Sequence, residues 1–193
     1  LSANLVATNL ALDGQATPID GQVASLTSRN NFINFCAGKT ITNGQQVTGG
    51  SCNPIPMGDI IPQANMPSCK FQFPENFGTI AANQPFTVRM RLNNLQAGTF
   101  TNAQKTYYMA PQFLNGNTLI GHTHVVIQQM GAFDDPAILD PKTFAFFKGV
   151  NTGQVNGVVT ADVTAGLPAG NYRMASINTS ANHTPAIAAV AQH

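Results

Sequence analysis

Short segments of alternating hydrophobicity, cut off by proline and glycine, are the feature that most constrains how this chain can fold. Twelve prolines and seventeen glycines punctuate its 193 residues, and no stretch keeps an amphipathic helical period for three turns. In residues 86–92, apolar side chains alternate with Thr87, Arg89 and Arg91, which is the pattern of a strand with one buried face. The sequence therefore predicts an all-β protein.

Several segments of this kind follow one another between residues 69 and 193. They are Cys69–Phe73, Phe86–Leu92, Leu119–Gln129, Thr143–Lys148, Val155–Val163, Asn171–Ile177 and Ala186–Ala191. This number of short strands is typical of an immunoglobulin-like (fibronectin-like) antiparallel β-sandwich. Residues 167–172 also match the corner of such sandwiches in which a tyrosine hydroxyl bonds back to the turn backbone, a role that falls to Tyr172. We therefore expect residues 69–193 to form one sandwich.

Residues 1–68 are poor in apolar periodicity, and we expect them to be an N-terminal extension that packs on the sandwich. Within them, Ala3–Leu12 has the pattern of an edge strand. Cys36 and Cys52 bracket a loop rich in Gly, Thr and Gln, and a disulfide between them would stabilise the extension by roughly 3 kcal/mol. That pairing leaves Cys69 free, although the pairings 36–69 and 52–69 stay open.

The chain carries unusually few charges. Asp, Glu, Lys and Arg make up 9% of its residues, against roughly 25% in ordinary soluble domains, and the net charge is +1. Nucleic acid is excluded as an expected partner because no basic stripe is present, and no apolar run is long enough for a membrane span. A neutral, amide-rich surface suits an extracellular protein, and the start at Leu1 without Met suggests a processed, secreted form.

Two asparagines begin sequences that are typical of N-glycosylation. Asn178 is followed by Thr and Ser, and Asn182 by His and Thr, so both match the Asn-x-Ser/Thr pattern. The sequence therefore makes the chain a candidate glycoprotein.

Three histidines are predicted to meet at one end of the sandwich. His122 and His124 project from the same face of the strand over residues 119–129, at a spacing of about 6.5–7 Å. His183 follows the segment 171–177, which neighbours that strand in an immunoglobulin-like sheet. Three imidazoles with one open position would suit copper or zinc.

Two alternatives to a metal site stay open. The histidines can be structural groups that only satisfy loop carbonyls. If Val125 and Ile127 form the core face, the pleat turns His122 and His124 outward, toward solvent, a neighbouring strand or the N-terminal extension.

Other catalytic arrangements are absent from the sequence. A paired-carboxylate site would need two aspartates, because Glu75 is the only glutamate, and Asp134, Asp135 and Asp140 lie in a proline-bounded loop that favours turns. No nucleophile elbow, phosphate loop or dinucleotide fingerprint occurs. Tyr107 and Tyr108 form the one adjacent pair of tyrosines, which would allow a sugar-stacking platform.

Several longer runs resemble a family of secreted, functionally uncharacterised proteins from mushroom-forming (basidiomycete) fungi, some of which carry a ribosomal small-subunit name. The runs are Asn31–Lys39, Gly50–Gly58, Gly121–Val125, Phe144–Gly149 and Leu167–Arg173. The near-neutral charge contradicts a ribosomal role. More distantly, the order of motifs is similar to small periplasmic immunoglobulin-like domains with histidine-rich strands. The resemblance implies an extracellular fungal protein and assigns no catalytic residue.

Two hypotheses about function follow from these observations. The first is a non-enzymatic structural or binding module of the fungal wall, matrix or secretome, whose partners are a cell-wall polysaccharide or a second copy of the chain. The second is a copper- or zinc-binding protein, or a metal-dependent enzyme, that uses His122, His124 and His183.

Overall fold

The computed structural model describes residues 2–13, 15–17, 24, 26–45, 53–103, 107–108 and 111–191. These residues divide into two compact units. The N-terminal unit comprises residues 1–42 and 47–54, and the sheet unit comprises residues 43–46 and 55–193.

The N-terminal unit begins with two short 3-10 helices, η1 (Ala3–Leu5) and η2 (Thr8–Ala11). The predicted edge strand over Ala3–Leu12 is therefore wrong. The Asn31 side chain gives a physical reason, because its Oδ1 accepts a hydrogen bond from the Ala7 amide and its Nδ2 donates one to the Leu5 carbonyl, both at 2.8 Å. Backbone groups that a strand would pair with another strand are bound here by one amide side chain.

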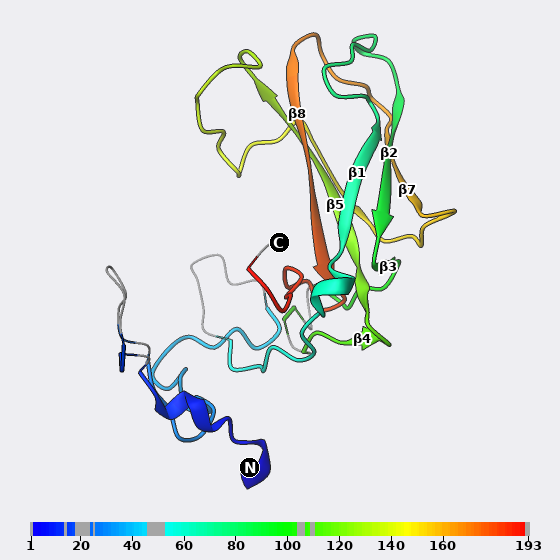
Figure 1. The fold of residues 1–193 in the computed structure, drawn as a ribbon. Helices are drawn as coiled ribbons and strands as arrows, with labels where there is room; N and C mark the ends of the chain where they lie inside the picture. Colours follow the sequence, from blue (N-terminus) through cyan, green and yellow to red (C-terminus); the bar gives the residue numbers. More distant parts are fainter. Residues whose placement is uncertain are drawn as a thin grey trace. The chain divides into compact units, whose positions relative to one another are not determined.

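The sheet unit is built from strands, with one short 3-10 helix, η3 (Gln63–Asn65), among its described residues. Its strands are β1 (Ser68–Phe73), β2 (Phe86–Asn93), β3 (Leu95–Ala97), β4 (Leu114–Asn115), β5 (Thr118–Met130), β6 (Phe146–Val150), β7 (Val158–Val163) and β8 (Asn171–Ser180). One sheet has the order β1-β2-β7, and the other is organised around β5, which pairs with β3, β4, β6 and β8. In Figure 1, β1, β2 and β7 lie to the right of β8.

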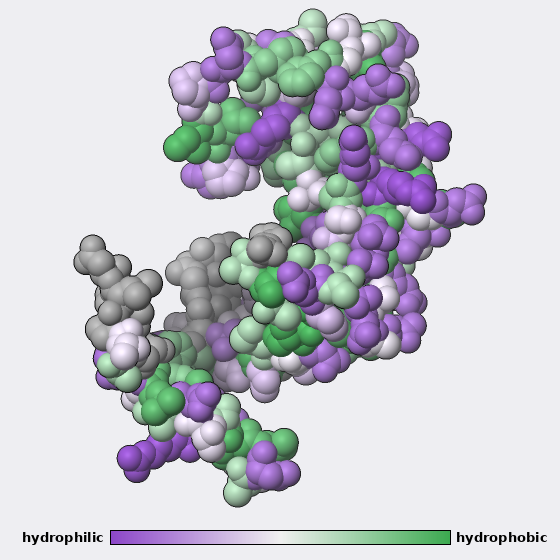
Figure 2. Space-filling model, viewed as in Figure 1, coloured by the Kyte–Doolittle hydropathy of each residue, from purple (hydrophilic) through white to green (hydrophobic). Residues whose placement is uncertain are grey.

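One apolar core joins the two sheets. Buried side chains of β2 and β7 belong to the same cluster as Val125 and Ile127 of β5 and Val150 of β6. Strand β2 buries Val88, Met90 and Leu92 and exposes the residues between them, as its alternation predicts. The face of β2 and β7 that points away from the core is polar. In Figure 2, hydrophilic residues cover most of the area over these two strands.

The expectation of an all-β protein is confirmed, because the described residues form two packed sheets and almost no helix. The predicted tyrosine corner is also present, because the Tyr172 hydroxyl donates a hydrogen bond to the Pro168 carbonyl at 2.9 Å. Among the described residues, no helix is long and apolar enough to cross a membrane.

Several predicted strands differ from the structure in their bounds: the one over Thr143–Lys148 is observed at Phe146–Val150, and the one over Asn171–Ile177 extends to Ser180. The segment predicted over Val155–Val163 begins later, at Val158, because Asn156 and Gly157 both adopt positive φ (51° and 75°) and form a tight turn. The backbone groups of Val155 and Val158 bond to each other across this turn at 2.9 and 3.0 Å.

The strand predicted over Ala186–Ala191 is also wrong. This segment makes only an isolated bridge between Ala188 and Ile61, and the preceding Pro185 bridges to Thr179. Its alanines offer little side-chain surface to a sheet, so local contacts with residues before β1 replace a ladder with β8.

Candidate functional site

The two faces of β5 carry different chemistry. Val125 and Ile127 point into the apolar core, at 1% and 3% exposure. Successive side chains of a strand alternate between its faces, so His122 and His124 lie on the outer face of the five-stranded sheet. The alternative in which Val125 and Ile127 form the core face is therefore the one that the structure shows.

A glycine at the start of this motif lets β8 approach β5 closely. In the register of the two strands, Gly121 pairs with Ser180 and His122 pairs with Thr179. A Cβ atom added at Gly121 would overlap the carbonyl oxygen of Thr179. The glycine of the Gly-His-Thr-His run thus has a structural role, because it brings Thr179 up to the ring of His122.

The structure brings the three predicted histidines together. The ring centroids of His122 and His124 are 4.9 Å apart, and those of His122 and His183 are 4.8 Å apart. His122 lies in the middle and is 1% exposed, while the other two rings are partly buried. The predicted convergence across about sixty residues of sequence is therefore confirmed, although the metal-binding role remains a prediction.

Each of the three rings has one nitrogen near an oxygen atom. His183 Nε2 lies 2.7 Å from the carbonyl oxygen of Thr101, and His124 Nδ1 lies 3.4 Å from that of Ile177. His122 Nε2 lies 3.2 Å from the Thr179 hydroxyl, which itself donates to the His122 carbonyl at 3.3 Å. The other nitrogen of the central ring, His122 Nδ1, is buried without a hydrogen bond of regular geometry, although the Thr99 carbonyl interacts with this ring.

The surroundings keep the central histidines neutral. Burial lowers the pKa of His122 to about 4, with repulsion from His124 and His183 acting in the same direction and the Thr99 carbonyl opposing it. Burial also lowers the pKa of His124, against the effect of the Ile177 carbonyl. Neutral imidazoles hold an unshared electron pair on one nitrogen, which is the form that binds metal ions.

The histidines form the middle of a longer series of aromatic contacts, which we call the ring row. Consecutive centroids are 3.9–5.6 Å apart in the order Phe144, Phe147, His124, His122, His183, Tyr107 and Tyr108. Of these, Phe144 and Phe147 were missed as site residues by sequence reasoning. The alternation of side chains in residues 146–150 could have identified Phe147. It turns Phe146 toward the core and Phe147 to the outer face of the sheet, where the histidines lie.

Tyr107 and Tyr108 end the ring row. Their rings are stacked at 3.9 Å, and the Tyr107 hydroxyl donates to the Tyr108 hydroxyl at 2.9 Å. Burial first, and then the hydrogen bond and charge of Tyr108, raise the pKa of Tyr107 to about 12. The Tyr107 phenol is therefore protonated at neutral pH.

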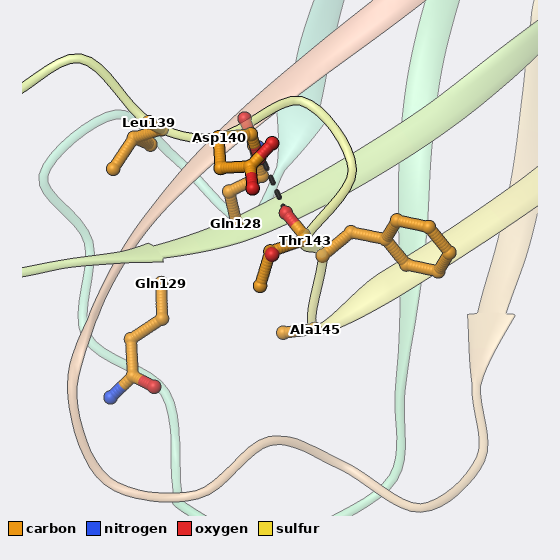
Figure 3. Close-up of a pocket in the computed structure, with 7 residues that line it drawn as sticks. Gln128, Gln129, Leu139, Asp140, Thr143 and Ala145 are labelled. Carbon is orange, nitrogen blue, oxygen red and sulfur yellow. Dashed lines mark hydrogen bonds between the residues drawn. The ribbon is translucent and has the colours of Figure 1, made fainter.

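A pocket of about 300 Å³ lies beside the other end of the ring row, next to Phe144. The Gln128 side chain forms part of its wall and donates to the carbonyls of Asp140 and Thr143, each at 3.0 Å (Figure 3). Gln128 Oε1 accepts a hydrogen bond from Arg173 at 2.7 Å. The pocket thus combines a fixed polar wall with the apolar side chains of Leu139 and Phe144.

The two predicted glycosylation asparagines differ in burial, since Asn178 is partly buried and Asn182 is buried. Asn178 lies within β8 and accepts a hydrogen bond from the buried Thr123 hydroxyl at 2.8 Å. Asn182 is 3% exposed, and its Oδ1 accepts from both the amide and the hydroxyl of Thr184. Burial of Asn182 argues against a glycan there, and glycosylation of Asn178 remains a prediction.

The predicted Cys36–Cys52 disulfide involves Cys52, which lies outside the described residues, so that pairing remains a prediction. Cys69 is a free cysteine, as expected, and its Sγ lies 3.1 Å from the Ser176 hydroxyl.

Comparisons with known proteins identify similar chains. A family model described as the CLU5d N-terminal domain matches residues 69–193. "Pathogenicity cluster 5 protein d" of the ascomycete Colletotrichum graminicola is 51% identical over 179 residues. This alignment covers 91% of the chain and extends into the residues before 69, but the chain spans only 37% of the relative's length. No solved structure matches.

Proposed function

Because the chain belongs to the family of the CLU5d N-terminal domain, we propose that it is a secreted fungal protein with a non-enzymatic role in binding cell-wall polysaccharide. The relative's name associates that protein with pathogenicity, and this proposal extends the association to the present chain. The expected fungal relationship is supported by this relative, which belongs to the ascomycetes rather than the mushroom-forming fungi. Extracellular location rests on the low charge and amide-rich composition.

We also propose that the two sheets form an immunoglobulin-like sandwich. In an immunoglobulin-like sandwich, strands A, B and E share one sheet and strands C and F share the other. The sheet β1-β2-β7 and the pair β5–β8 correspond to that division, and the corner at Tyr172 supports it. Residues 181–191, the described part of the chain after β8, form no ladder, which is a departure from the usual seventh strand.

The ring row is the observation that carries the proposed binding function. Phe144 and Phe147 are 52% and 48% exposed, and Ile177 beside His124 is 44% exposed. Exposed apolar side chains gathered on one sheet face mark an interaction surface. Aromatic rings provide large contact areas with little conformational entropy to lose, and the C–H faces of sugar rings stack on them.

The ligand class follows from the shape and charge of this face. An extended series of rings matches a linear ligand with repeated flat units better than a compact one. The partly buried ring of His124 and the Tyr107 hydroxyl supply hydrogen-bonding groups, and burial lowers the pKa of His124 and raises that of Tyr107, which favours their uncharged forms. The adjoining pocket at Gln128 and Phe144 offers room for one unit or end of such a chain. A neutral polysaccharide fits these features.

Cosedimentation of the full chain with chitin, β-glucan and mannan tests the proposal. We expect binding to at least one of them, and a loss of affinity of at least about fivefold on Phe147→Ala, which corresponds to roughly 1 kcal/mol. Phe133→Ala is the matched control, because Phe133 is also exposed (57%) but contacts Phe77 rather than the ring row.

Uniform failure to bind all three polysaccharides would remove the wall-binding function. Equal loss of affinity in the two variants would instead show that the ring row is not the binding surface. Self-association is tested in the same preparations by sedimentation velocity. Concentration-dependent dimers weakened by Phe147→Ala would assign this face to a second copy of the chain and overturn the polysaccharide proposal.

A further inference from the structure

We infer that the open edge of β8 pairs with the same edge of a second copy of the chain, in antiparallel register about Ala175. The five-stranded sheets of two molecules then join into one continuous sheet. The inference does not depend on polysaccharide binding, because β8 and β6, which carries Phe147, flank β5 on opposite edges. It rests on unpaired backbone groups along β8, on a contrast with other edge strands, and on the charges of this strand.

The backbone of β8 is paired along one side. It forms a ladder with β5 over its whole length, Asn171–Ser180. Just beyond, the Ala181 amide still donates to the Ile120 carbonyl, whereas the Ser180 amide turns away from β5 and donates to the Thr184 carbonyl at 3.0 Å. Backbone groups of successive residues point to opposite sides of a strand, so every second residue before Ser180 turns its amide and carbonyl away from β5. These outward residues of β8 are Tyr172, Met174, Ser176 and Asn178.

The described segment after β8 covers only the end of this edge. Ser180 bonds to Thr184, and Thr179 forms an isolated bridge with Pro185, but Ala188 bridges to Ile61 instead. Within the described parts of the chain, no hydrogen bond reaches the amides and carbonyls of the outward residues of β8 on their open side. Such a row of donors and acceptors is a template for a further strand from another chain.

Other edge strands of the sheet unit carry features that prevent such pairing. Strand β1 exposes Lys70 and has an irregular register with β2, β6 has five residues and exposes Lys148, and β7 exposes Asp162. Short length, irregular pairing and charged side chains are the means by which proteins protect their edges. Strand β8 has ten residues, no proline and a single charge, Arg173. It is therefore the edge with the least protection against a partner strand.

A second copy of β8 matches this edge by symmetry. Antiparallel pairing relates two identical strands by a two-fold axis, so the same surface meets itself. With the axis at Ala175, the open stretch 172–178 pairs with itself from end to end, and each outward residue faces another outward residue. All of their open amides and carbonyls then gain partners. Ala175 projects from the outer face with Ile177, so two small side chains meet at the axis.

The side chains of β8 also favour a copy of the same strand. In this register Arg173 lies opposite Ile177 of the second copy. The two Arg173 positions are roughly 14 Å apart along the strands, beyond the Debye length of about 8 Å at physiological salt. On the inner face, Tyr172 and Met174 pack against the core but stay partly buried, and a neighbouring strand would cover them further. The net charge of +1 gives two copies little repulsion.

Sedimentation velocity of the full chain at rising concentration, up to about 1 mM, tests for the dimer. We expect a reversible monomer–dimer equilibrium, and a monomer at every concentration would overturn the proposal. Amide hydrogen exchange followed by NMR locates the interface. The amides of the outward residues of β8 should exchange more slowly as the dimer fraction rises, whereas those between them, which already bond to β5, should change little. A dimer that leaves the outward amides unprotected would assign association to another surface and would also overturn the proposal.

Substitutions at Ser176 test the pairing of the backbone. Ser176→Pro removes one outward N–H and leaves the ladder with β5 intact, because proline is tolerated where the N–H of an edge strand faces solvent. The dimer Kd should rise at least about fivefold, since the symmetric interface loses two hydrogen bonds. Ser176→Ala keeps the N–H and is the matched control, with an unchanged Kd. Equal Kd values in these two variants, with circular dichroism showing intact sheets in both, would contradict edge pairing.

A pair of substitutions at Ile177 tests the register without altering the backbone. Ile177→Lys places a positive charge opposite Arg173 of the second copy and should raise the Kd, whereas Ile177→Glu forms an attractive pair there and should not. Equal Kd values in these two variants would overturn the register about Ala175. Phe147→Ala should leave the dimer unchanged, and weakening by that variant would place the interface on the ring row instead of β8.

Discussion

The two faces of β5 have different roles in the sheet unit. One packs in the apolar core, and the other carries the histidines. Toward the other sheet, Val125 and Ile127 belong to the apolar core cluster. On the outer face, His122 is as well buried as Val125, at 1% exposure each, yet it is covered by rings and anchored by polar atoms. Burial alone does not identify a core, because the chemistry of the covering groups differs completely between the faces.

The outer face also differs from the core in how its burial changes along the sheet. It passes from the buried His122 through the partly buried His124 to the exposed Phe147. On the core face, Leu119, Thr123, Val125 and Ile127 are all buried. A surface that joins a buried polar centre to exposed aromatic rings is suited to binding, whereas a uniformly dry face contributes chiefly to folding.

The largest effect should come from shortening a side chain on the core face. Ile127→Ala is expected to lower the free energy of unfolding by about 2–5 kcal/mol, because the cavity adds to the lost apolar contact. Urea denaturation measures the change. The adjacent Val126→Ala, on the partly buried outer face, is the matched control and should cost less than about 1 kcal/mol. Equal losses of unfolding free energy in the two variants would contradict the assignment of Ile127 to the core face and Val126 to the outer face.

Acidification should weaken the fold through the buried histidine of the outer face. Burial lowers the pKa of His122 to about 4 in the folded protein, whereas an unfolded histidine titrates near 6.5. Between about pH 6.5 and pH 4, His122 is therefore protonated in the unfolded chain but stays neutral in the folded one. The free energy of unfolding falls over this range of pH. The full loss at this group is at most about 3 kcal/mol.

Denaturation of the chelator-treated protein at several pH values measures this loss. His122→Gln should reduce the slope of the profile between pH 6.5 and pH 4, because the substituted group does not titrate, and His124, whose pKa burial also lowers, accounts for the slope that stays. A profile that keeps its slope in this variant would assign the acid sensitivity to other groups.

A smaller effect is expected from the hydroxyl that anchors the central ring. Thr179→Val keeps the shape of the side chain but leaves both His122 Nε2 and the His122 carbonyl without their partner. We expect a loss of about 1–2 kcal/mol in unfolding free energy, the usual cost of orphaned buried polar groups. Thr160→Val, at an exposed position of β7, should change stability by less than about 0.5 kcal/mol.

Sequence reasoning predicted the parts of this arrangement that depend on alternation and on local corners. It located β2, the long β5, the Tyr172 corner and the convergence of the histidines, because each follows from strand period or from the order of strands in a sandwich. Strands β3 and β4, with three and two residues, are too short to show any period.

The loop that lies over the histidines could not be predicted from the sequence, for a different reason. The loop that carries Thr101 and Tyr108 is positioned by backbone hydrogen bonds to Ala181 and Asn182, at 2.8 and 3.2 Å, from residues about eighty positions away. Such contacts leave no periodic signal in either segment. The sequence indicates that the rings meet, but it contains no local pattern for what closes over them.

The smallest effect on stability, and the sharpest test of the two faces, should come from Phe147→Ala. Phe147 is 48% exposed and stacks on His124 with centroids 5.5 Å apart and an angle of 22° between the planes. Little apolar area returns to water when it is shortened, so the unfolding free energy should change by about 0.5 kcal/mol or less. The ring resonances of His124 should nevertheless shift, while those of His183, which contacts His122 and Tyr107 instead, should stay. A destabilisation above about 2 kcal/mol would mean that the outer face belongs to the folding core, and the comparison between the two faces of β5 would then fail.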